Sequence, residues 1–132
     1  MQLNQQLGLF RYACYIPSWF KEGLAVIVSS GGGAETVSET EAKAAIAAGH
    51  TFDPPLSGRL LFQQSGRTYG LSAHMWYRQS ALLVQFLRDK NQTKFRTMLL
   101  SIQDGRPFKR ALTEAYSEQF TDLMKEFRSK VN

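Results

Sequence analysis

The sequence predicts an all-α fold of about six to seven helices, formed by a single domain over residues 1–132. Apolar residues recur at the three- and four-residue spacing of amphipathic helices, whereas no segment alternates convincingly between apolar and polar residues as a strand would. Capping residues, glycines and prolines separate these segments and mark where helices begin and end. A chain of 132 residues with 43% hydrophobic residues can bury a core of its own.

The N-terminal third of the sequence is predicted to form two helices followed by a loop. Residues 1–11 are predicted to form a short helix, because their apolar residues fall on one face. A second helix is expected over 17–28, with Pro17 in its first turn, where the missing N–H costs nothing. The serines and glycines of 29–33 end it and predict a mobile loop, and no P-loop lysine follows them to make a phosphate site.

Capping signals define the next helix. Ser38 and Glu41 form a capping box ahead of an alanine-rich run, and Gly49 is placed to end that helix. Residues 50–71 are expected to be largely irregular because they contain two consecutive prolines and several glycines.

Residues 72–131 are predicted to form a helical C-terminal bundle. Ser72 caps a long helix that ends near Lys90, and the next helix starts at Thr93. A turn at 104–107 leads into two further helices, one over residues 108–116 and one that begins near Ser117 or Glu118.

Composition narrows the classes of function. The formal charge of +5 is modest, and no block of Lys and Arg or basic stripe with stacking aromatics predicts nucleic-acid binding. No apolar run approaches the roughly 18 residues that span a bilayer, so no membrane span is expected. The start of the chain has no signal-peptide pattern, and because the true N-terminus can lie further upstream, the localisation stays unknown. The single Cys14 cannot form an internal disulfide and says nothing of the redox compartment.

The most informative segment is Pro17-Ser18-Trp19-Phe20-Lys21-Glu22-Gly23-Leu24-Ala25. It places a carboxylate, Glu22, in an otherwise apolar helix. A buried carboxylate must be paired, hydrogen-bonded or bound to a metal. The alternative is a partly exposed glutamate that faces solvent beside Lys21.

This segment resembles the helix that carries the third zinc ligand in gluzincin metallopeptidases, the peptidase-MA-like superfamily, where the context is W-(L/F)-x-E-G-(L/F)-A. Residues 77–87 resemble a later helix of that family, Y-x-(K/Q)-(G/S)-A-x-x-(L/V)-x-x-L, and residues 94–128 resemble its C-terminal tail. The matches are in the family's order and together span roughly residues 15–128. The resemblance implies the family's C-terminal helical subdomain, with Glu22 as a zinc ligand and Tyr77 as a hydrogen-bond donor to the tetrahedral intermediate.

The chain departs from the family in one respect that decides its activity. The family's two other ligands and its general base lie in an H-E-x-x-H motif, two histidines one turn apart with a glutamate between them, and this sequence has no such motif. In the family that helix lies about twenty residues before the ligand glutamate, so residues 1–11 are interpreted as its remnant. A lone carboxylate cannot hold zinc, and the chain as given is therefore expected to be inactive and free of a cofactor.

His74 and Tyr77 share a helix face because they are three residues apart. His74 is a candidate auxiliary ligand or acid–base group, although a histidine in such a position more often packs and hydrogen-bonds. Tyr77 is either the hydrogen-bond donor described above or a packed aromatic with a satisfied hydroxyl. The other histidine, His50, is expected to be exposed. No G-x-S-x-G motif or nucleophile–histidine pairing indicates a serine or cysteine hydrolase.

Two functions remain. The first is the C-terminal fragment of a zinc metallopeptidase, which hydrolyses a peptide or protein substrate only in an intact parent that binds zinc. The second is a non-catalytic helical module that binds a protein partner or itself. In that case, an apolar groove exposed near Glu22 and Tyr77 would make a homo-oligomer.

Overall fold

The computed structural model describes residues 16–57 and 65–131, and in that part of the chain it contains six α-helices and no strand. The all-α prediction is therefore confirmed, while the helix expected over residues 1–11 lies outside the described residues. The elements are α2 (Ser18–Val28), α3 (Glu39–Ala47), the 3₁₀ turn η2 (Gly66–Tyr69), α4 (Ala73–Lys90), α5 (Gln92–Gln103), α6 (Phe108–Tyr116) and α7 (Phe120–Val131).

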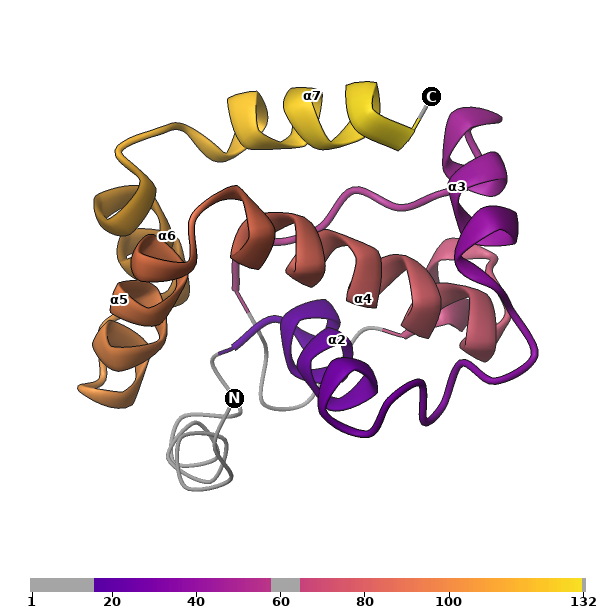
Figure 1. The fold of residues 1–132 in the computed structure, drawn as a ribbon, viewed down its shortest axis with the longest axis horizontal. Coiled ribbons are helices and arrows are strands. Elements are labelled where there is room, and N and C mark those ends of the chain that lie inside the picture. The colour runs from indigo at the N-terminus through magenta and orange to yellow at the C-terminus, as the bar shows by residue number, and fades with distance from the viewer. Residues whose placement is uncertain (1–15, 58–64, 132) are drawn as a thin grey trace.

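The long helix α4 lies at the centre of the fold (Figure 1). In that view α7 runs above α4 and α2 lies below it, while α5 and α6 stand together beyond one end and α3 lies at the other. The closest packing between any two of these elements is that of α2 against α4. None of the six helices is both long and apolar enough to cross a membrane.

Local sequence signals set most helix boundaries. Ser38 caps α3 by accepting a hydrogen bond from the Glu41 backbone N–H at 3.1 Å, and the predicted capping box is present. Ser72 caps α4 in the same way, with its hydroxyl 3.1 Å from the Met75 nitrogen. Gly49 follows α3 with a φ of 86°, a left-handed conformation that glycine adopts without strain. These three predictions are confirmed.

Two boundaries differ from prediction. Helix α5 begins at Gln92 rather than Thr93, because the side chain of Asn91 caps it by accepting from the Lys94 N–H at 2.9 Å. Helix α7 begins at Phe120, two to three residues later than expected. Ser117 adopts a left-handed φ of 55° that ends α6, and this turn separates the two helices.

One hydrophobic cluster contains buried side chains from all six helices. Aromatic rings fill its centre near the C-terminal end of α4. Phe108 of α6 lies 4.9 Å from Phe20 and 5.7 Å from Trp19 between ring centroids, both in edge-on contacts. Such contacts add to the stabilisation from burial alone. They tie the N-terminal half of α2 to the C-terminal helices.

Candidate functional site

Glu22 lies in the second turn of α2 and is half-buried. Within the described residues its carboxylate makes no hydrogen bond and no ion pair, with Tyr77, Arg78 or any other group. Among the described residues, therefore, no neighbour neutralises this half-buried carboxylate.

The residue after Glu22 explains how its helix is held. A Cβ atom built on Gly23 would lie 2.6 Å from the backbone oxygen of Ser80 and 2.7 Å from a methyl group of Val84. Since real Cβ atoms do not come so close, only glycine lets the backbone of α2 lie directly on α4. The Glu-Gly pair therefore combines a carboxylate with the close approach that fixes its helix.

Glu22 and Tyr77 lie toward opposite ends of this helix pair. Gly23 faces Ser80 and Val84, whereas Gly33, beyond the C-terminal end of α2, faces the ring of Tyr77. The two helices therefore run in opposite directions, and the start of α2 lies near the C-terminal half of α4. The structure shows no contact that joins the Glu22 carboxylate to Tyr77 among the described residues.

Tyr77 lies in the first half of α4, half-buried. Its ring packs 5.4 Å from that of Trp76 and contacts the small cluster of Val26, Ala34 and Ala81. Its hydroxyl has no hydrogen-bond partner among the described residues. The ring is thus held by packing while the hydroxyl stays available as a donor.

His74 binds the loop between α2 and α3. Its Nδ1 atom lies 2.6 Å from the Thr36 hydroxyl, and the Thr36 backbone N–H donates to the same nitrogen at 3.4 Å. The Thr36 side chain and backbone both contact one imidazole nitrogen. His74 thus packs and hydrogen-bonds here, and its predicted auxiliary role remains a proposal.

Arg78 is a residue that the sequence reasoning did not select. Its Nε donates to the Val37 carbonyl at 2.8 Å and its Nη2 donates to the Ala34 carbonyl at 3.2 Å. Beside it, the Gly33 N–H donates to the Glu35 carboxylate at 3.0 Å and lowers the pKa of Glu35 below its ordinary value, with a further contribution from the charge of Arg78. The signal in the sequence was the four-residue spacing of His74 and Arg78, which places both on one face.

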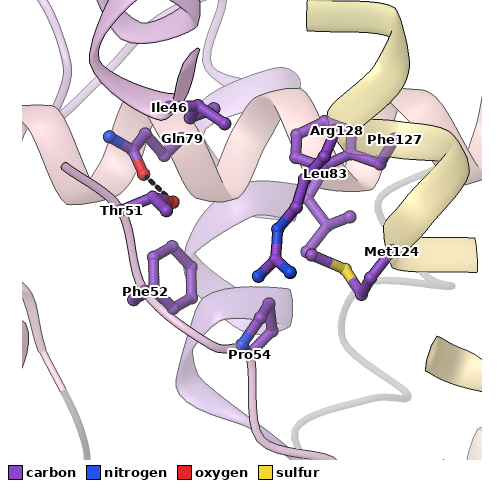
Figure 2. Close-up of a pocket in the computed structure, with 9 residues that line it drawn as sticks. All are labelled: Ile46, Thr51, Phe52, Pro54, Gln79, Leu83, Met124, Phe127 and Arg128. Atoms are coloured by element: carbon purple, nitrogen blue, oxygen red, sulfur yellow. Dashed lines mark hydrogen bonds between the residues drawn. The ribbon is translucent and has the colours of Figure 1, made fainter. Parts of the chain in front are cut away.

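A separate small pocket lies between α3, α4 and α7 (Figure 2). The buried Gln79 forms one wall, where its Oε1 accepts from the Thr51 hydroxyl at 2.7 Å and its Nε2 donates to the His50 carbonyl at 2.9 Å. Arg128, across the pocket, forms an ion pair with Asp53 at 2.9 Å. The cavity is about 10 Å³, on the scale of one water molecule, and contains neither Glu22 nor Tyr77.

The described residues do not by themselves fit a zinc ion. Zinc sites use at least three protein ligands, and in residues 16–57 and 65–131 no three His, Cys, Asp or Glu side chains gather in a way that could hold a metal.

The structure shows that α2, which carries Glu22, packs on α4, which carries Tyr77, and that further helices follow α4. No family model, curated protein or solved structure matches this chain.

Proposed function

We propose that this chain is the C-terminal helical part of a gluzincin-like zinc metallopeptidase, in which Glu22 is the third protein ligand and the chain is inactive by itself. One observation carries this proposal. The Glu22 carboxylate is half-buried, has no partner within the described residues, and lies on the helix that packs most closely against the Tyr77 helix. Taking a carboxylate partly out of water without a partner is unfavourable, so a bound cation would explain its position.

The pairing of Glu22 with Gly23 supports the same proposal. Zinc ligands must be held in fixed geometry, and residues on rigid helices achieve this better than residues on loops. The glycine contact with Ser80 fixes α2 against the longest helix of the fold. Peptide hydrolysis would require a segment with H-E-x-x-H, which this sequence does not contain.

The proposal is tested first in the gene. The DNA upstream of the Met1 codon is read in frame, and we expect it to encode H-E-x-x-H. The extended protein is then produced with Glu22→Gln and, as a matched control, with Glu39→Gln, which makes the same change at an exposed position of α3.

Zinc content and affinity of the extended protein give the result. Loss of an outer-shell partner already costs about 10–100-fold in zinc affinity, so Glu22→Gln is expected to cost at least that much, with loss of peptidase activity. Glu39→Gln should change neither. An unchanged zinc affinity in Glu22→Gln, an upstream reading frame without the motif, or stoichiometric zinc on the 132-residue chain would contradict the proposal.

The alternative proposal, a self-associating helical module, has less support. Among the described residues the large apolar side chains that are exposed are Val28, at 42%, and Leu100, at 46%, and they lie on different helices, α2 and α5. Two separated side chains do not form the apolar groove that self-association would use. Light scattering at high concentration distinguishes the two proposals, since a module of this kind would be a dimer.

A further inference from the structure

The segment of residues 31–37, here called the strap, lies against the first half of α4 and is held there by side chains of that helix. Arg78 donates to the backbone carbonyls of Ala34 and Val37, and His74 binds Thr36. These attachments span about forty residues of sequence, so they are tertiary contacts and not a local turn.

The contact between the strap and Tyr77 needs glycine for two reasons. Gly33 has a φ of 92°, in the left-handed region, and a Cβ atom there would lie 3.0 Å from Cδ2 and 3.3 Å from Cε2 of the Tyr77 ring. The backbone of the strap thus lies directly on the ring edge. Ala34, fully buried, packs with Ala81 and Val26 beside the same ring.

We infer that the strap fixes the orientation of the Tyr77 ring, and that His74 and Arg78 are positioning residues that act on Tyr77 through the strap. The ring is covered by Gly33 on one side, and the strap is attached by His74, three residues before Tyr77 on α4, and by Arg78, the residue after it. Its hydroxyl is left without a partner among the described residues, as a donor aimed at a ligand would be. The role of Tyr77 toward a substrate rests on the proposed function, whereas its fixation by the strap does not.

The attachment is tested by hydrogen exchange on the 132-residue protein. The amides of Ala34 and Val37 are bonded to carbonyls within the strap, and they report on whether it stays folded on α4. Arg78→Ala removes two hydrogen bonds from a charged donor and should make both amides exchange roughly tenfold faster or more. Arg88→Ala, the same change near the other end of α4, should leave them unchanged. Equal exchange in both variants would overturn the attachment.

The effect on Tyr77 is tested by NMR of ring-labelled tyrosines. Gly33→Ala and Gly49→Ala impose the same left-handed strain, with φ values of 92° and 86°, but nothing lies within 4 Å of a Cβ at Gly49. Gly33→Ala should therefore shift the Tyr77 ring signals, and Gly49→Ala should not. The buried ring of Tyr116 on α6 serves as an internal reference, because its hydroxyl donates to Leu87, at the end of α4 far from Tyr77.

Positioning requires both results together. Arg78→Ala and His74→Ala should shift or broaden the Tyr77 ring signals as well as speed exchange in the strap. Faster exchange with unchanged ring signals would overturn the positioning role. Because neither readout involves zinc or hydrolysis, failure here leaves the proposed function standing, and failure of the zinc test leaves this inference standing.

Discussion

The two halves of α4 pack by different means. The first half meets α2 and the strap through small residues, Gly23, Gly33 and Ala81, which let backbones come close together. The second half meets α5, α6 and the start of α2 through large apolar side chains, among them Leu87 and Phe95. Only the packing of the first half requires glycines, because a Cβ atom at Gly23 or Gly33 would come too close to α4.

The two halves also differ in buried polar atoms that lack a partner, although Gln79 in the first half makes two hydrogen bonds. In the second half, the Tyr116 hydroxyl donates to the Leu87 carbonyl at 2.5 Å, and burial raises the pKa of that hydroxyl. In the first half, Trp76 Nε1 and Ser80 Oγ are buried with no hydrogen-bond partner, and these are the only such side-chain atoms among the described residues. Orphaned buried polar atoms reduce stability, so the first half is less well optimised for folding.

The difference separates a conventionally packed half of α4 from one that departs from local rules. Among the described residues, the first half combines orphaned polar atoms with left-handed glycines of the strap. Departures of this kind concentrate at functional sites. Tyr77 and the strap belong to this region, whereas Glu22 lies toward the start of α2, nearer the second half of α4.

The largest loss of stability is expected in the aromatic cluster, where large apolar side chains pack against one another. Phe108→Ala removes a buried ring that contacts both Trp19 and Phe20, and it should lower the free energy of unfolding by about 3–5 kcal/mol. Urea unfolding followed by circular dichroism measures this. A loss below about 1 kcal/mol would show that the aromatic cluster is not the stable part of the fold.

Gly23→Ala tests whether the close approach of α2 and α4 is real. In an open helix this change stabilises by about 1 kcal/mol, because alanine is the better helix former. Here the added Cβ would meet the Ser80 backbone oxygen at 2.6 Å, so overpacking should lower the free energy of unfolding by about 1–3 kcal/mol instead. The sign of the change in the urea midpoint decides between the two. Stabilisation would remove the contrast between the halves of α4.

The sequence alone was sufficient to predict most of the helices, but it predicted few of the contacts around the candidate site. Ser38 and Ser72 marked helix starts, because a cap depends only on residues three positions away. Helical periodicity predicted amphipathic helices, and their buried faces, which include Phe95 and Phe108, form the core. Each of these features is local, so a single sequence contains it.

The contacts that build the candidate site are not local. Gly23 meets Ser80 and Arg78 meets Ala34 across more than forty residues, and no spacing rule connects positions so far apart. Residues 29–33, which include the start of the strap, were expected to be a mobile loop, since a run of serines and glycines has no pattern that indicates attachment. What the sequence did offer was the Glu22-Gly23 pair, and Gly23 proved to be where α2 lies directly on α4.

The smallest effect compares one substitution at two serines. Ser38→Ala removes the hydroxyl that caps α3 and should lower the free energy of unfolding by about 1 kcal/mol. Ser80→Ala removes a buried hydroxyl that has no partner, so it should be neutral or slightly stabilising, and both values come from the same urea experiment. If Ser80→Ala instead costs as much as Ser38→Ala, the hydroxyl has a partner in solution. The hydrogen bonds of the first half of α4 would then be better satisfied than its orphaned buried atoms suggest, and any functional role proposed for it would rest on Tyr77 and the strap alone.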